Sequence, residues 1–132
     1  MKSTAVSNND HSILSDQERK NIQIEINNYL VQYFEKKTGK GISTIKVDLY
    51  KEMLLIRIEG FLTDSEKSIA VTPAGIDTIR ISRAQAARQN ILDNIDILEK
   101  KLGAKVFYQT YDIDPEKDFA TYLIIFDRIL TD

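Results

Sequence analysis

The fold is decided by the stretch Glu52-Met53-Leu54-Leu55-Ile56-Arg57-Ile58-Glu59-Gly60-Phe61-Leu62-Thr63-Asp64-Ser65-Glu66. Apolar residues alternate from Leu54 to Ile58, which is the pattern of a strand with one buried face. Gly60 then permits backbone angles that other residues avoid. Thr63 and Glu66 have the spacing of a capping box at the start of a helix. The stretch therefore predicts a strand, a sharp turn and a helix in direct succession.

A helix and a hairpin are predicted before this junction. Ser15 and Glu18 form a second capping-box pattern, and a stripe at helical spacing follows it, consisting of Ile22, Ile26, Tyr29, Leu30 and Tyr33. Gly39 or Gly41 is expected to end this helix. The strand-like runs 45–49 and 54–58 are joined by a short polar link, which predicts an antiparallel hairpin.

Two helices are predicted after the junction. The first runs from the Thr63 cap through Ala70 and stops before Pro73, because a proline disfavours helical angles in the residue before it. Thr72 and Pro73 are typical of a new helix start, and Gly103 of its end. This second helix would be about 45 Å long. It would overhang a small sheet, so we expect either a kink near residues 82–84 or a partner.

The last two strands are predicted at 106–108 and 122–126, with 114–118 as their loop. The expected order is α-β-β-α-α-β-β. We therefore predict an α+β fold, a single two-layer domain with a four-stranded, mostly antiparallel sheet and its helices on one face. Residues 1–14 are expected to be a disordered tail and residues 15–132 the domain.

Composition excludes several classes of function. The chain has 132 residues, with 18 Lys and Arg against 20 Asp and Glu. It therefore has no net positive charge that would favour binding to nucleic acid. It contains no cysteine, which excludes thiolate chemistry and favours a cytoplasmic location. Its apolar runs are far shorter than the ~20 residues that span a bilayer, so we expect no membrane insertion. The one histidine, His11, lies in the predicted tail. We therefore predict no enzyme, no catalytic residue and no cofactor.

Four carboxylates alternate at the predicted last loop, at Asp112, Asp114, Glu116 and Asp118. They superficially resemble a calcium-binding loop, in which oxygen ligands converge. The glycine of the EF-hand turn is missing and Pro115 stiffens the middle. We therefore interpret them as a solvated hairpin loop and predict no metal site.

Three arginines on the long helix are the candidate binding residues, Arg80, Arg83 and Arg88. Positions 80 and 83 share a helix face and 88 lies near its edge, so they are predicted to hold an anionic partner or ligand. The alternative is that they form ion pairs with Asp77 and Glu66.

The same helix carries an apolar stripe that a small sheet cannot fully cover, at Ile76, Ile79, Ala86 and Ala87. Exposed stripes of this kind usually mark an interface. We predict a two-fold homodimer through the helix 73–102, and the alternative is a kinked helix in a monomer.

The chain resembles the MpsC-like family from about Glu18 to Asp127. The resemblance lies in Gly39-Lys40-Gly41, the 53–66 stretch, the segment 75–83 and Asp112 followed by Phe126. Its specific core is G-x-L-T-x-x-E, formed by Gly60, Leu62, Thr63 and Glu66. Ile42, Lys40 and Asp114 depart from residues common in the family.

This resemblance implies an accessory role in a cation-translocating, membrane-potential-generating system that is linked to inorganic-carbon uptake. It implies protein partners, among them membrane-bound transport subunits, at the inner face of the membrane. We therefore predict a non-catalytic cytoplasmic protein that acts by docking. The alternative is a regulator that senses an anionic metabolite or nucleotide through the helix arginines.

Overall fold

The computed structural model describes residues 13–38 and 42–132. Its elements are α1 (Asp16–Thr38), β1 (Thr44–Tyr50), β2 (Met53–Glu59), α2 (Asp64–Ile69), α3 (Pro73–Leu102), β3 (Val106–Asp114) and β4 (Phe119–Phe126). This order confirms the predicted α-β-β-α-α-β-β arrangement, and the fold is α+β.

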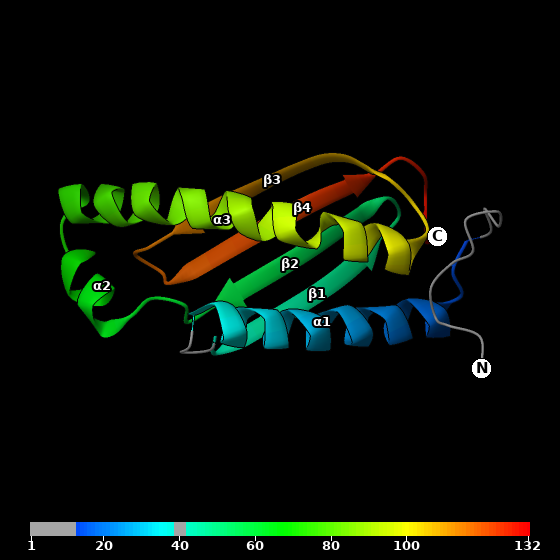
Figure 1. Cartoon of the computed structure of the whole chain (residues 1–132), viewed down its shortest axis with the longest axis horizontal. Coiled ribbons are helices and arrows are strands. Elements are labelled where there is room, and N and C mark those ends of the chain that lie inside the picture. The colour runs from blue at the N-terminus through cyan, green and yellow to red at the C-terminus, as the bar shows by residue number, and fades with distance from the viewer. Residues whose placement is uncertain (1–12, 39–41) are drawn as a thin grey trace.

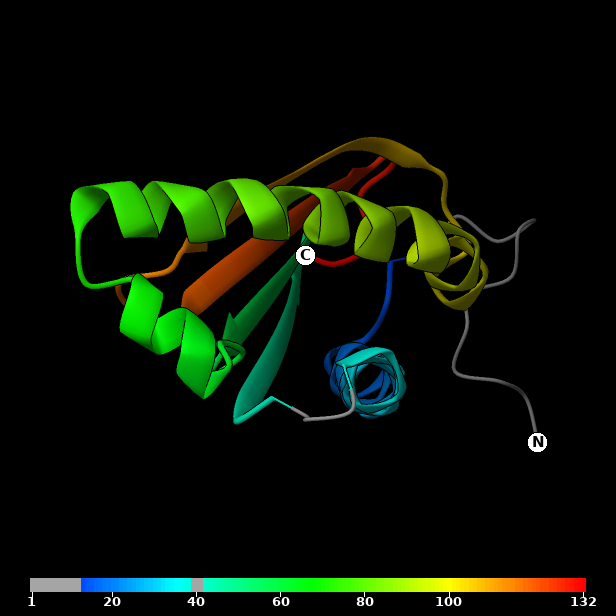
Figure 2. The same cartoon turned by 60° about the vertical axis from the view of Figure 1, so that its left-hand side comes forward.

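The strands form one sheet in the order β1-β2-β4-β3, and every neighbouring pair is antiparallel. Figure 1 shows α1 and α3 lying side by side in front of this sheet, and Figure 2 shows the same two layers after rotation. α1 packs on β1 and α3 packs on β3. Both long helices therefore cover one face of the sheet, as the sequence predicts.

The core lies between the helices and the inward face of the sheet. The alternating pattern of β2 continues on β4, where every second side chain is buried. The helices contribute the fully buried Ile22 and Ile26 from α1 and Leu98 and Leu102 from α3. The predicted stripe of α1 is confirmed, because its tyrosines are partly buried against this core.

Local signals place the ends of the elements. Ser15 and Glu18 form the predicted reciprocal capping box, with N···O distances of 2.8 and 3.1 Å. Thr72 caps α3, Pro73 follows it, and Gly103 ends the helix with φ 62°. The predicted end of α1 at Gly39 or Gly41 lies outside the described residues.

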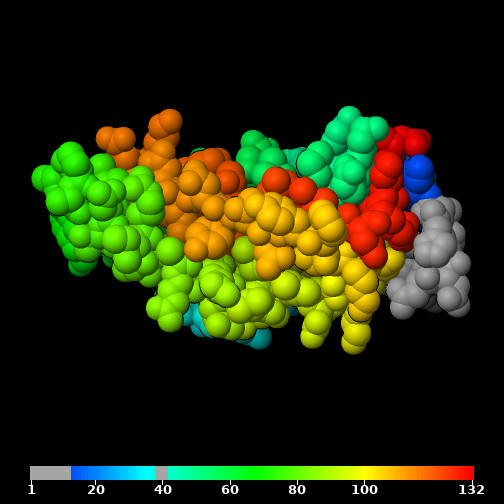
Figure 3. All heavy atoms as spheres, turned by 90° about the horizontal axis from the view of Figure 1, so that it is seen from above, coloured from blue at the N-terminus to red at the C-terminus, as the bar shows by residue number. Residues whose placement is uncertain are grey.

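Two boundaries differ from the sequence pattern. β3 and β4 are both longer than the predicted runs. For β3 the reason is that it is an edge strand, whose exposed residues hide the alternation. Figure 3 looks from above onto the atoms of β3 beside those of α3.

Residues 1–12 of the predicted tail lie outside the described residues. Leu14, the last residue of that tail, is buried, and its amide donates to the Leu130 carbonyl at 2.8 Å.

α3 is one continuous helix from Pro73 to Leu102, and it extends past the sheet. Figure 1 shows its N-terminal end projecting beyond the strands, with α2 beside it. A Cβ at Gly75 would lie 1.8 Å from the Ile69 carbonyl oxygen, so glycine allows α2 and α3 to approach each other. Ile79 is only 3% exposed.

The predicted dimer stripe on α3 therefore needs correction. Ile79 and Ala87, two of its members, are buried within the single chain, and Ile76 is partly buried. The sequence pattern missed this burial because α2 and β3 pack against the overhanging half of α3. Ile79 and Ala87 therefore cannot form an interface between folded copies. Ala86 is exposed, and the homodimer through α3 stays a prediction.

Paired substitutions on α3 test this burial. Ile79→Asp should destabilise the chain by more than about 3 kcal/mol, because it places an unpaired carboxylate in an apolar site. Ile81→Asp, two residues away at a position that is 73% exposed, should change the free energy of unfolding by less than about 0.5 kcal/mol. Urea unfolding followed by circular dichroism measures both. Equal stability of the two variants would show that Ile79 is not buried in the monomer.

Candidate functional site

The predicted motif residues build a turn between β2 and α2. Gly60 has φ 74°, a conformation that other residues rarely adopt. A Cβ at this position would lie 2.1 Å from the Ser43 side-chain oxygen. Leu62, two residues later, is 1% exposed. The turn therefore requires glycine, and the leucine anchors it in the interior.

Asp118 holds this turn in place. One oxygen of its carboxylate, Oδ1, accepts hydrogen bonds from the amides of Phe61 and Leu62, both at 2.9 Å. Its carbonyl oxygen accepts from the Gly60 amide at 3.0 Å. Three successive amides after β2 thus bind one residue of the β3–β4 hairpin. The hairpin loop that we interpreted as solvated has a structural role at this residue.

Thr63 and Glu66 form the predicted capping box at the start of α2. The Thr63 amide donates to Glu66 Oε1 at 2.9 Å, and the Glu66 amide donates to Thr63 Oγ1 at 3.2 Å. Arg83 from α3 binds the same carboxylate through Nε and Nη2, at 2.8 and 2.5 Å. These bonds to Arg83 lower the pKa of Glu66. The motif therefore joins α2 to α3.

Arg83 also binds the turn itself. Its Nη2 lies 3.2 Å from the Phe61 carbonyl oxygen, and its guanidinium lies 5.3 Å from the centre of the Phe61 ring. The latter is a cation–π contact. One arginine therefore contacts the turn, the cap and the long helix.

The three predicted arginines do not converge on one site. Arg80 pairs with Asp77 at 2.8 Å and donates to the Ile113 carbonyl at 3.3 Å. Arg83 is engaged with Glu66, so the structure contains both ion pairs of the alternative interpretation. Arg88 is exposed and makes no hydrogen bond or ion pair within residues 13–38 and 42–132. An anion held by all three would have to break two ion pairs.

The four alternating carboxylates also point to different partners. Asp118 binds amides of the turn, and Asp114 Oδ1 accepts from the Lys117 amide at 3.1 Å. Asp112 is exposed on β3, paired in the strand register with Thr121. In the described part of the chain, no three acidic or histidine side chains gather as metal ligands would.

A small cavity lies beside Arg83, between α1, α3 and the sheet. Its volume is about 40 Å³, which is room for one or a few waters. Its polar lining includes Asn90, whose Nδ2 donates to the Tyr122 hydroxyl at 3.2 Å. Burial raises the pKa of Tyr122. The cavity is too small for an organic ligand.

Polar side chains join the two long helices next to this cavity. The Tyr33 hydroxyl lies 2.8 Å from Asp93 Oδ2 and 3.0 Å from Asn90 Oδ1. Tyr29 donates to Asn94 at 2.6 Å. Burial and the bond to Asp93 raise the pKa of Tyr33. These contacts set the spacing of α1 and α3.

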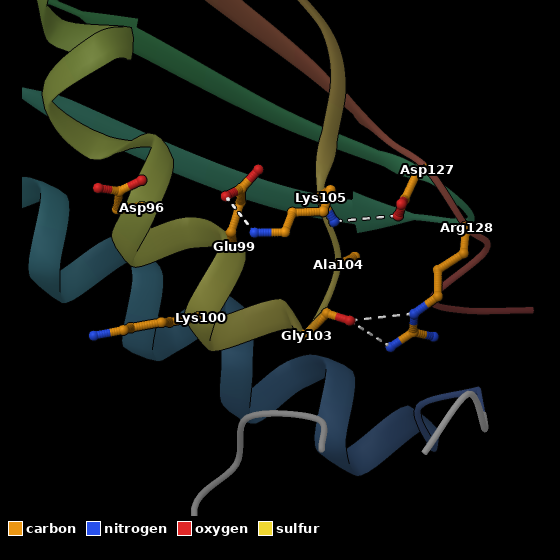
Figure 4. A pocket seen from close by; sticks show the side chains of 8 residues that line it. All are labelled: Asp96, Glu99, Lys100, Gly103, Ala104, Lys105, Asp127 and Arg128. Carbon is orange, nitrogen blue, oxygen red and sulfur yellow. Dashed lines mark hydrogen bonds and ion pairs between the residues drawn. The ribbon is translucent and has the colours of Figure 1, made fainter. Parts of the chain in front are cut away.

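A larger hollow of about 550 Å³ lies at the C-terminal end of α3. Figure 4 shows that its acidic and basic side chains are interspersed. Arg128 donates to the Gly103 carbonyl through Nε and Nη2, at 3.3 and 3.1 Å, and the Lys105 amide donates to Asp127 at 3.1 Å. In Figure 4, Lys100 points away from the paired groups. Mixed charges of this kind select neither an anion nor a cation.

Sequence reasoning missed Asp118, Asn90 and Asn94 as organising residues. A signal existed for the two asparagines, because they stand four residues apart among the buried positions Ala87, Ile91 and Leu98. A polar pair on a buried helix face predicts hydrogen-bonding partners from a neighbouring element. Asp118 had no such signal, because its partners are 56 and 57 residues away in the sequence.

The fold and the junction define a class: small α+β proteins in which two helices cover one face of an antiparallel sheet and a G-x-L-T-x-x-E turn connects the sheet to the helices. The chain belongs to the MpsC family, described as Na+-translocating membrane potential-generating system (MpsC), which matches residues 18–128. The predicted family is confirmed.

The chain is similar to two proteins of Bacillus subtilis (strain 168) whose names describe them as uncharacterised. The protein YbcI is 27% identical over 85 residues, which cover 64% of this chain and 68% of YbcI. The protein YrhF is 27% identical over 110 residues, which cover 79% of this chain and 86% of YrhF. No solved structure matches the chain.

Replacing Asp118 should loosen the turn. Asp118→Asn keeps the size of the side chain but removes the charge that strengthens two hydrogen bonds, and we expect a loss of about 1–3 kcal/mol of stability. Glu116→Gln, at an exposed position of the same loop, is the matched control and should change stability by less than about 0.5 kcal/mol. Chemical denaturation measures both. A similar effect of the two substitutions would mean that the Asp118 charge does not hold the turn.

The Glu66–Arg83 pair predicts a pH dependence of stability. Because the folded-state pKa of Glu66 lies below its usual value of 4.5, the pair stabilises the fold above that pH. This stabilisation is lost as the pH falls through the lower folded-state pKa. The difference in unfolding free energy between wild type and Glu66→Gln should therefore shrink between about pH 7 and pH 3.

A double-mutant cycle with Arg83→Met isolates the pair. At neutral pH it should give a coupling of about 1–3 kcal/mol, because both side chains are mostly buried. Glu35→Gln, at an exposed position of α1, is the control. A coupling near zero would show that the pair contributes nothing to stability.

Proposed function

We propose that this chain is a non-catalytic, cytoplasmic accessory subunit of a Na+-translocating, membrane-potential-generating system, and that it docks on the membrane-bound subunits of that system. The observation that carries the proposal is the family match over residues 18–128. Among the described residues, no helix has the length and hydropathy of a transmembrane span. In this proposal the chain reaches the inner face of the membrane through its partners.

The outer face of α3 is the surface that we assign to this docking. Ile81, Gln85, Arg88 and Leu92 follow one another at i, i+4, i+7 and i+11, so they form one stripe. Ile81 is 73% and Leu92 is 51% exposed. None of these four residues is among the buried positions of α3. This outer stripe is defined by those four residues.

The chemistry of the outer stripe suits a protein partner. Arginine and large apolar residues are enriched in the cores of protein interfaces, and they carry much of the binding energy there. Arg88 has no acidic partner in the described chain, whereas Arg80 and Arg83 have one each. We therefore expect the partner to supply a carboxylate opposite Arg88, flanked by apolar side chains. Arg80 would lie at the rim, and Arg83 would hold the helix in place through Glu66.

Affinity capture of the tagged chain from its native host, after mild crosslinking, tests the proposal. The wild type should recover an integral membrane subunit of a cation-translocating system, identified by mass spectrometry. Ile81→Asp combined with Arg88→Glu should reduce that recovery at least tenfold, because it places two like charges opposite the expected carboxylate.

The matched control uses the other long helix. Ile24→Asp combined with Lys36→Glu makes the same kinds of change at exposed positions of α1, where Ile24 is 60% exposed. This variant should recover as much partner as the wild type. Equal losses in both variants would exclude the outer stripe as the docking surface. Recovery of no membrane subunit by a folded wild type would overturn the proposed function.

A further inference from the structure

The sheet face opposite the helices carries an apolar band. In the strand register Tyr50, Met53, Ile125 and Tyr108 form one row across β1, β2, β4 and β3. Leu55 and Leu123 stand beside each other in the middle of the next row, which ends in Asp48 on β1 and Thr110 on β3. Tyr50 and Tyr108, at the two ends of the first row, are 56% and 52% exposed. No described helix or strand packs on this face.

The following row on the same face carries basic side chains at its β1 end and an acidic side chain at its β3 end. It reads Lys46, Arg57, Thr121 and Asp112 from β1 to β3. The basic end lies on one edge strand and the acidic end on the other. Arg57 pairs with Asp48 at 3.2 Å, but its Nε is buried without a hydrogen-bond partner in the described chain. Lys46 and Asp112 are exposed, and neither has a hydrogen-bond or ion-pair partner among the described residues.

We propose that this open sheet face binds a second copy of the chain, face to face, about a two-fold axis parallel to the strands and between β2 and β4. Such an axis lays β1 of each copy over β3 of the other. Each row of residues in one copy then faces the same row in the other copy. Lys46 of each copy then faces Asp112 of the other, and the pairing occurs twice by symmetry. A two-fold axis across the strands would lay β1 over β1 and β3 over β3, so Lys46 of one copy would not face Asp112 of the other.

The apolar rows match under the same axis. Leu55 of one copy lies over Leu123 of the other, Met53 over Ile125, and Tyr50 over Tyr108. Packed sheets keep their strand directions within about 30° of each other, so the small rotation leaves β1 over β3. Four strands about 4.8 Å apart and seven residues at about 3.4 Å each give a face of about 450 Å² in plan. The two copies together would cover about 900 Å², which is below the roughly 1,200–2,000 Å² of stable interfaces, so the dimer should be weak and reversible.

This arrangement gives Asp112 a role that the single chain does not show. It places the contact between copies on the sheet and not on α3, whose Ile79 and Ala87 are buried within the single chain. The inference does not depend on the proposed function, since the outer stripe of α3 and the open sheet face belong to different layers.

Complementary charge reversals test the axis. Sedimentation velocity of the wild type, from micromolar to millimolar concentrations, should show a monomer–dimer equilibrium. Lys46→Glu and Asp112→Lys should each weaken it at least tenfold, because each variant places like charges opposite one another. An equimolar mixture of the two single variants should form a one-to-one dimer, since both pairings between positions 46 and 112 then join opposite charges. The double variant in one chain should dimerise as the wild type does.

The controls separate the register from a general charge effect. Lys100→Glu, at an exposed position of α3, should leave dimerisation unchanged. Circular dichroism should show that all variants are folded, because positions 46 and 112 are exposed. A wild type that stays monomeric throughout would overturn the inference. A mixture of the single variants that does not associate would overturn the proposed axis.

Discussion

The hydrogen bonds from the Phe61 and Leu62 amides to the carboxylate of Asp118 are the interaction on which the other features depend. They join the end of β2 to the start of β4 and determine where the chain leaves the sheet. Gly60 makes the turn possible because it adopts a positive φ. The ion pair between Glu66 and Arg83 then holds α3 next to the turn. The G-x-L-T-x-x-E motif therefore acts through geometry, because its polar groups are satisfied by one another and by Asp118 and Arg83.

The position of α3 follows from this junction and separates two surfaces. Its inner face is occupied by the core and by the contacts of Asn90 and Asn94 with the tyrosines of α1 and β4. Its outer stripe faces away from the sheet, and the apolar band lies on the other side of the sheet. Under the two proposals, one chain would present a helix to a partner and its sheet to a second copy at the same time. An accessory subunit of this design would bring two docking helices to one assembly.

Local chemistry explains which predictions were confirmed. Capping at Ser15 and Thr63, the start of α3 at Pro73 and its end at Gly103 depend on groups within a few residues of each other. Alternation along β2 needs only a sheet that is buried on one side. The limits of β3 could not be predicted in this way, because an edge strand alternates weakly and its pairing with β4 is what defines it. The sequence pointed to the motif residues of the candidate site. It did not point to Asp118 as the residue that binds them.

The sequence by itself determined the element order, the turn at Gly60, the helix caps and membership of the MpsC family. Each of these is encoded in residues close together in the chain. Only the tertiary structure decided that Arg80 and Arg83 are paired while Arg88 has no ion-pair partner among the described residues. It also decided that Ile79 is buried and that Lys46 and Asp112 lie at opposite ends of one row. The reason is physical: the pairing of a charge and the burial of an apolar group depend on which distant elements pack together.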